Sequence, residues 1–274
     1  MFTSSVLSIE RVGPVGLIWL DRAAKYNALS TELWSAIPNA IAELTGDATI
    51  KAIVLAGRGK HFCVGIDLME NVIGSEEPRS GSSEAIENLR KLENTGNFQA
   101  AISSLADSAL PVIAVVHGHC LGAGIDLISA CDIRVCSADA NFSVRETRIG
   151  IVADVGTLQR LPKIVSAGHV AELAYTGKDI DARRAEKIGL VNDSYDSFDN
   201  AFAAGMALAH DISANSTLAV RGTKFMLRKS ENLSTDQSLT LNAMFTLLTS
   251  LKSNDLKESI DAFMSRRPPN YTGS

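Results

Sequence analysis

Short apolar, β-branched segments alternate with helix-like patterns through the first two-thirds of the chain, and this alternation constrains the fold more than any other feature. Buried strands are predicted at residues 15–20, 53–56, 112–116 and 133–136. Between them, apolar residues recur at helical spacing, first from Leu33 to Leu44 and again from Phe98 to Leu105. Pro38 lies inside the first pattern, so that helix is either kinked or begins there. Strands that alternate with helices predict an α/β fold with a largely buried sheet.

The last part of the chain, from about Phe198, carries no further strand signals. Phe198, Phe202 and Met206 mark one helix, and Ser234 with Gln237 forms a capping-box pattern ahead of another. A final helical pattern ends before two consecutive prolines. Such an apolar helical tail needs a surface to cover, so it either packs on its own core or builds an oligomer. Before this tail, the polar segment 74–84 is expected to be an exposed loop.

The composition is that of a soluble globular protein, with 46% hydrophobic and 21% charged residues among 274. The formal net charge of −5 gives no general attraction to nucleic acid or anionic membranes. No apolar run approaches the ~20 residues that a membrane helix needs. The N-terminal stretch does not resemble a signal peptide, and the last residues are not a peroxisomal signal. We therefore expect a cytoplasmic protein with neither a nucleic-acid nor a membrane partner.

The four cysteines, Cys63, Cys120, Cys131 and Cys136, form no CxxC pair and have no histidine at metal-ligand spacing. We expect all four to be reduced packing residues. No metal site is predicted.

A glycine-rich turn, HGHCLGAG at 117–124, follows the strand predicted at 112–116 and leads into a helix from Ile125. A helix start of this kind leaves backbone N–H groups free to bind an anion or to stabilise an oxyanion. The alternative is a tight connection whose glycines only permit close packing. The turn lacks the dinucleotide pattern G-x-G-x-x-G. A similar turn, HFCVGIDL at 61–68, follows the strand predicted at 53–56, so two N–H groups could face one carbonyl oxygen.

Three carboxylic acids are candidates for the chemistry: Asp126 and Asp154 lie in otherwise apolar stretches, and Glu146 follows the strand-like segment 142–144. Burial raises the pKa of a carboxyl group toward the range useful for proton transfer. Structural alternatives remain for each residue. Asp126 could be a helix N-cap, Glu146 could form a salt bridge to Arg145 or Arg148, and Asp154 could be a turn residue.

The segments HGHCLGAGIDLISACDIRVCSADANFSV and RETRIGIVADVGTLQRLPKIV resemble the enoyl-CoA hydratase/isomerase (crotonase) superfamily. DRAAKYNALS, KAIVLAGRGKHFCVGIDL and ESIDAFMSRRPPNY are similar to other segments of that family, so the likeness spans nearly the whole chain. The resemblance implies an α/β spiral of ββα units over 1–197 and a helical trimerisation region over 198–274. It also implies a homotrimer or a dimer of trimers, which would explain the apolar tail.

By position in these motifs, the resemblance places the oxyanion-hole donors at the backbone N–H groups of Ile66 and Ala123. It places the two acids of the hydratase branch at Asp126 and Glu146. Hydratases normally carry glutamate at the first of these positions and a small residue where Asp154 stands. The three acids followed by VGTLQRLPK resemble the dienoyl-CoA isomerase branch.

This branch implies conversion of 3,5-dienoyl-CoA to 2,4-dienoyl-CoA in fatty-acid degradation, with no external cofactor. Glu146 is then the base at C2 and Asp154 the acid at C6, four carbons away, while Asp126 orients the site or shares protons. Two separated carboxyl groups suit the task, because one cannot readily reach both carbons. The residues that the resemblance implies for binding coenzyme A are Ala24, Lys25, Tyr26 and Val64, with Phe263 and Arg266 from a neighbouring subunit.

The first alternative function is a 2-enoyl-CoA hydratase that uses Asp126 and Glu146 to add water. Thioester hydrolysis, dehalogenation and decarboxylation occur on the same scaffold. A non-catalytic member that binds coenzyme A or RNA is a further alternative, and the acidic balance and the three acids argue against it. His61, His117 and His119 are expected to be structural.

Overall fold

The computed structural model describes residues 2–70 and 82–274, and its centre is a six-stranded sheet in the order β1-β2-β3-β4-β6-β9. The hairpin β1–β2 is antiparallel and every other neighbouring pair is parallel. The strands are Leu7–Val12, Val15–Leu20, Ala52–Gly57, Val112–Val116, Ile133–Ser137 and Asp193–Tyr195. The four predicted strands are confirmed as β2, β3, β4 and β6. They occupy the middle of the sheet, where both faces are covered and the apolar run is continuous.

A second, three-stranded sheet is much smaller. Its strands, in the order β5-β7-β8, are His119–Leu121, Asn141–Ser143 and Ile180–Asp181. β5 pairs with β7 in parallel and β7 with β8 antiparallel. These strands have two or three residues each, too few for any periodicity to appear in the sequence.

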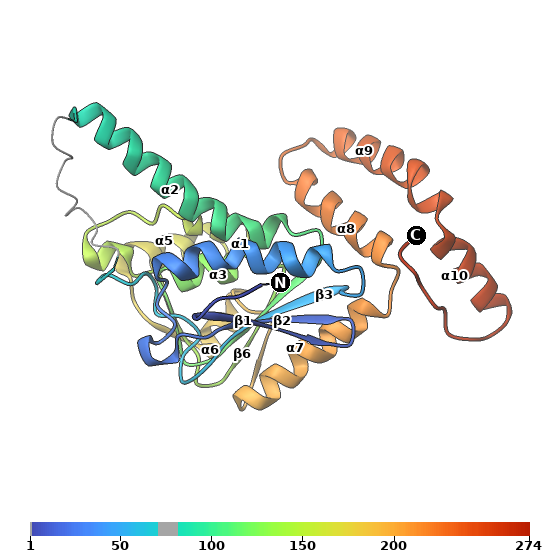
Figure 1. Cartoon of the computed structure of the whole chain (residues 1–274), viewed down its shortest axis with the longest axis horizontal. Coiled ribbons are helices and arrows are strands. Elements are labelled where there is room, and N and C mark those ends of the chain that lie inside the picture. Colours follow the sequence, from blue (N-terminus) through green and yellow to red (C-terminus); the bar gives the residue numbers. More distant parts are fainter. Residues whose placement is uncertain (1, 71–81) are drawn as a thin grey trace.

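Helices cover both faces of the main sheet, in an α/β arrangement (Figure 1). On β3, Ile53 and Leu55 face the larger apolar cluster, which includes α1 (Thr31–Gly46), α2 (Glu84–Asp107) and α3 (Ala123–Ala130). Val54, between them, faces a second cluster with α7 (Phe198–Ser213). The alternation follows from the two-residue period of a strand. The predicted α/β class is confirmed.

Two details of the predicted helices change. α1 begins at Thr31, with the Ser30 side chain accepting from Leu33 N–H, and it continues through Pro38, so a start at Pro38 is wrong. Most of the segment 74–84, expected to be an exposed loop, lies outside the described residues. Of its last three residues, Ser83 caps α2 and Glu84 is the first residue of that helix.

The C-terminal helices α8, α9 and α10 extend away from the main sheet, whereas α7 packs on it (Figure 1). The capping box of Ser234 and Gln237 is confirmed at the start of α9. Within the described ranges 2–70 and 82–274, no helix is long and apolar enough to cross a membrane. The remaining helices are α4 Thr157–Arg160, α5 Ala167–Thr176, α6 Ala182–Lys187, α8 Thr217–Ser230, α9 Thr235–Leu248 and α10 Asn254–Met264.

Candidate active site

A cavity of about 320 Å³ brings together most of the residues that the sequence singled out. All three predicted acids line it, together with both predicted oxyanion-hole residues and Val64 of the predicted coenzyme A site. The rest of its wall is mainly apolar, with Trp34, Phe98, Leu68, Ile149, Ile151, Val152 and Val155. Charged groups in such surroundings are poorly solvated, so proton transfer and charge stabilisation within this cavity have large energetic effects.

The two glycine-rich turns are joined to each other by backbone hydrogen bonds. Cys63 N–H donates to His119 O (3.0 Å), and Leu121 N–H donates to Cys63 O (2.9 Å). Gly65 and Gly122 have φ angles of +102° and +53°, a region that favours glycine. A Cβ on Gly65 would lie 3.1 Å from Leu121 O, so the two turns approach closely.

The N–H groups of Ile66 and Ala123 come from these turns, and both residues line the cavity. On either side of Ile66, Gly65 O accepts from Leu29 N–H (2.8 Å) and Asp67 N–H donates to Leu29 O (3.0 Å). The N–H of Ile66 therefore faces away from Leu29. Ala123 is the first residue of α3, where a backbone N–H has no acceptor within the helix. Across the described part of the chain, neither N–H has a hydrogen-bond acceptor, so both are available to a ligand oxygen.

Asp126 lies in the first turn of α3 and is 1% exposed. Its Oδ1 accepts from both the N–H (2.5 Å) and the hydroxyl (2.7 Å) of Thr157, at the start of α4. The helix N-cap interpretation of Asp126 is therefore wrong. Burial raises the pKa of Asp126 to about 6, and the two hydrogen bonds from Thr157 limit the rise.

Glu146 follows β7 and begins a short 3-10 helix, Glu146–Ile149. Burial raises the pKa of Glu146 to about 7, and the negative charges of Asp126 and Asp154 add to the rise. Its Oε2 is buried and has no partner among the residues that the structure describes. The salt-bridge interpretation is wrong, because Arg145 pairs with Asp179 (2.7 Å) and Arg148 Nε donates to Thr176 O (3.4 Å).

Asp154 lies in the irregular segment between the 3-10 helix 146–149 and α4. Its backbone oxygen accepts from Gln99 Nε2 of α2 (2.6 Å), while its exposed side chain lines the cavity. The segment at Asp154 is not a regular turn. Within the described residues no hydrogen bond or ion pair engages the carboxyl group of Asp154, so this group is available to a ligand.

The predicted coenzyme A residues fall into two groups. Ala24 and Lys25 lie in the 3-10 helix Ala23–Lys25. Tyr26 follows this helix, is 54% exposed, and accepts a hydrogen bond at its backbone oxygen from Val64 N–H (3.2 Å). This loop therefore adjoins the turn that carries Ile66. By contrast, Phe263 of α10 is 81% exposed, and neither it nor Arg266 lines the cavity. A role for these two residues through a neighbouring subunit stays a prediction.

The histidines and cysteines lie outside the cavity lining. The rings of His61 and His119 stack with centroids 4.4 Å apart, and His117 Nε2 lies 3.0 Å from Gly59 O. All four cysteines are unpaired and buried. Over residues 2–70 and 82–274, no cluster of three or more histidine, cysteine, aspartate or glutamate side chains could hold a metal ion.

Sequence reasoning missed several residues that shape the site. Trp34 and Phe98 line the cavity with ring centroids 4.8 Å apart. Asn27 is fully buried, and its side chain donates to Arg58 O (2.9 Å) and His61 O (2.8 Å), which fixes the turn that leads to Ile66. The positive φ of Asn27 (+56°) is typical of asparagine in loops, but no local pattern marks it as buried.

Comparison with known proteins identifies the family of this fold and site. The family model described as enoyl-CoA hydratase/isomerase matches residues 10–274. The mitochondrial delta(3,5)-delta(2,4)-dienoyl-CoA isomerase of Dictyostelium discoideum is 39% identical over 258 residues, covering 91% of this chain and 85% of that protein. The peroxisomal enzyme of the same name from Arabidopsis thaliana is 38% identical, covering 92% of this chain and 90% of that protein. The crystal structure of an enoyl-CoA hydratase from Bacillus anthracis has a TM-score of 0.87 and 28% identity, covering 98% and 100% of the two chains.

The expectation of a cytoplasmic location is wrong by this comparison, because the two isomerases named above are mitochondrial and peroxisomal. That expectation depended only on missing sorting signals, and a missing signal does not identify a compartment. The crotonase-like α/β core and C-terminal helical region, in contrast, are confirmed by the structural neighbour. The chain belongs to the enoyl-CoA hydratase/isomerase (crotonase) family and is an enzyme of that family.

Proposed function

We propose that the enzyme isomerises 3,5-dienoyl-CoA thioesters to 2,4-dienoyl-CoA thioesters in fatty-acid degradation. One observation carries the proposal: three carboxyl groups and two free backbone N–H groups line one largely apolar cavity. The 38–39% identity to proteins named dienoyl-CoA isomerase supports it. The acyl-CoA thioester is the substrate, and the chemistry needs no external cofactor or metal.

In the proposed reaction the substrate loses one proton at C2 and gains one proton at C6. Glu146, whose pKa of about 7 suits a general base, takes a proton from C2. The thioester oxygen then carries negative charge, which the N–H groups of Ile66 and Ala123 stabilise. Asp154 delivers a proton to C6, so the double bonds at C3 and C5 become double bonds at C2 and C4.

Asp126 is proposed to tune the site instead of touching the reacting carbons. Its carboxyl group is held by Thr157 and is almost completely enclosed by protein. When ionised, it opposes ionisation of the nearby Glu146. Asp126 and Glu146 therefore titrate as a coupled pair.

Coenzyme A is proposed to lie along the loop of Ala24, Lys25 and Tyr26 and against Val64, with Phe263 and Arg266 supplied by a neighbouring subunit. The proposed assembly is a homotrimer or a dimer of trimers built by the C-terminal helices. Large apolar side chains remain exposed on α9 and α10, and a partner subunit would cover them. They are Leu239, Met244, Leu247, Leu248, Leu256, Ile260, Phe263 and Met264.

Hydration of a 2-enoyl-CoA is the second candidate, because structural neighbours include hydratases and the cavity holds the pair Asp126 and Glu146. The third acid in the same cavity, Asp154, favours the isomerase, since hydration would use only Asp126 and Glu146. Ultraviolet absorbance of purified enzyme mixed with a 3,5-dienoyl-CoA, and separately with a 2-enoyl-CoA, tests the choice. Conjugated-dienoyl absorbance with little hydration is expected. Rapid hydration with no dienoyl conversion would contradict it.

A further inference from the structure

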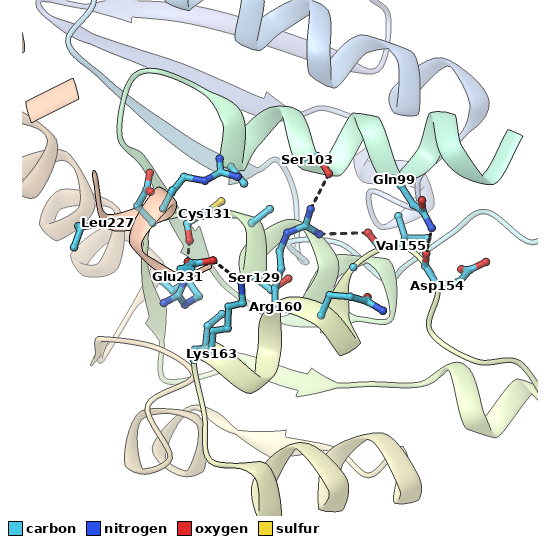
Figure 2. Close-up of a pocket in the computed structure, with 18 residues that line it drawn as sticks. Gln99, Ser103, Ser129, Cys131, Asp154, Val155, Arg160, Lys163, Leu227 and Glu231 are labelled. Carbon is cyan, nitrogen blue, oxygen red and sulfur yellow. Dashed lines mark hydrogen bonds and ion pairs between the residues drawn. The ribbon is translucent and has the colours of Figure 1, made fainter. Parts of the chain in front are cut away.

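A second cavity of about 720 Å³ is lined in part by the segment that carries Asp154 (Figure 2). Among the residues that the structure describes, Asp154 and Val155 alone line both cavities. Figure 2 shows Asp154 and Gln99 at one end of the second cavity, Leu227 and Glu231 at the other, and Arg160 between them. Asp154 therefore stands in the wall between an apolar cavity and a separate one.

The second cavity, here called the polar cavity, has charged and hydrogen-bonding side chains at both ends and in the middle, with apolar side chains between them. Arg160 donates to Ser103 Oγ (2.8 Å) and to Val155 O (3.4 Å), and its guanidinium lies against Gly156. Lys163 pairs with Glu231 at the far end. Side chains of this kind hydrogen-bond water, so the cavity favours solvent over an acyl chain.

The inference below rests on the proposed isomerase function. One isomerisation leaves both catalytic carboxyl groups in the opposite protonation state from the one that the next isomerisation needs. After each turnover Glu146 carries the proton taken from C2, and Asp154 lacks the proton given to C6. Before the next turnover Glu146 must lose a proton and Asp154 must gain one. As long as the product's acyl chain fills the apolar cavity, it keeps water away from Asp154 on that side, so a second access to solvent would let Asp154 regain its proton before the product leaves.

We propose that the polar cavity is the route by which Asp154 takes up its proton from solvent. The exposed carboxyl group of Asp154 borders this cavity, and the cavity's polar lining supports a chain of water molecules that carries the proton. Asp126, the third acid that lines the apolar cavity, is 1% exposed and its Oδ1 is engaged by Thr157, so it is poorly placed to relay a proton from Glu146 to Asp154.

Filling the polar cavity tests the proposal. Gln159→Trp and Ala106→Phe each place a ring in it without removing a side-chain hydrogen bond found in the described structure. Ala100→Trp is the matched control, since Ala100 is exposed on the same helix as Ala106 and lines neither cavity. Each enzyme is mixed rapidly with excess 3,5-dienoyl-CoA, and the absorbance of the product is recorded over the first and later turnovers. We expect wild type and the control to give one linear phase. Each filled variant should give one product per site at the wild-type rate, then a phase about tenfold slower.

A second readout uses substrate that carries deuterium at C2. Uptake through the polar cavity predicts that the label is lost to water and that the hydrogen at C6 comes from solvent. Retention of the label at C6, or filled variants that match Ala100→Trp in every turnover, would overturn the proposal while leaving the isomerase function standing. A wild-type enzyme that converts no dienoyl-CoA at all would instead overturn the proposed function, and this inference with it.

Discussion

Thr157 donates both its backbone N–H and its hydroxyl to the same carboxylate oxygen of Asp126, at 2.5 and 2.7 Å. The two residues are 31 positions apart, and the contact joins the start of α4 to the first turn of α3. It holds an almost fully buried carboxyl group beside the proposed general base.

Replacement of Thr157 by valine should destabilise the protein and raise the pKa of Asp126 further. The variant keeps the shape and the N–H bond but loses the hydroxyl donor to a buried carboxylate, which costs about 1.5–3 kcal/mol. Thr147→Val is the matched control, because the Thr147 hydroxyl donates to a backbone oxygen, Ala174 O. Urea unfolding near pH 7 measures the difference. Equal losses in the two variants would contradict a special role for the bond to Asp126.

The raised pKa values of the two buried acids predict how stability depends on pH. Between pH about 4 and about 6, Asp126 is protonated in the folded protein but ionised in the unfolded chain. For Glu146 the same difference extends up to pH about 7. The free energy of unfolding should therefore fall as pH rises through these windows and level off above them. Asp126→Asn should remove the part of this decrease that comes from Asp126. The free energy of unfolding of the variant should therefore exceed that of wild type by about 3 kcal/mol near pH 8 and differ little from it at pH 4. Unfolding curves at both pH values measure this, and a variant equally stabilised at both would contradict the assignment.

The activity of the wild-type enzyme should decline below pH about 7, because Glu146 acts in its ionised form and its pKa is about 7. The value of kcat/KM should fall about tenfold per pH unit on this side. Glu146→Gln should lower kcat about 10²–10⁴-fold at every pH. A pH profile of kcat/KM measured on a 3,5-dienoyl-CoA checks both statements. A profile that stays flat from pH 5 to 8 would rule out Glu146 as the base.

Gly122→Ala should disrupt the proposed oxyanion hole. Gly122 has φ +53° and ψ −121°, a combination that only glycine adopts readily, so alanine must shift the start of α3 and the N–H of Ala123. Loss of one donor costs about 10²–10³ in kcat. Ala123→Gly, which retains the N–H, is the control and should keep activity within about threefold. Near-normal turnover by Gly122→Ala would show that this N–H is not used.

The parts of the fold that the sequence predicted are those with strong local signals. The central strands are continuous apolar runs because both faces are buried, and the capping box at Ser234 is set by two residues three positions apart. The strands β5, β7 and β8 were missed because two or three residues carry no period.

The site divides in the same way. The glycine-rich turns and the three acids were visible as separate features, and family resemblance brought them together. The partner of Asp126 was not predictable, since nothing local to Thr157 indicates contact with a residue 31 positions away. The polar cavity beside Asp154 is lined by residues of α2, α3, α4 and α8 and of the segment after α3, which are distant in sequence, so no motif could reveal it.

The central claim is that Asp154 supplies the proton at C6 of a 3,5-dienoyl-CoA. The most direct measurement compares ultraviolet absorbance of wild type and Asp154→Asn on this substrate, with hydration of a 2-enoyl-CoA followed in parallel. We predict that wild type forms the conjugated 2,4-dienoyl product and that Asp154→Asn loses this activity about 10²–10⁴-fold while still binding the thioester. Dienoyl conversion that survives the substitution would contradict the role of Asp154. A wild type that only hydrates 2-enoyl-CoA, equally well with and without Asp154, would contradict the isomerase function itself.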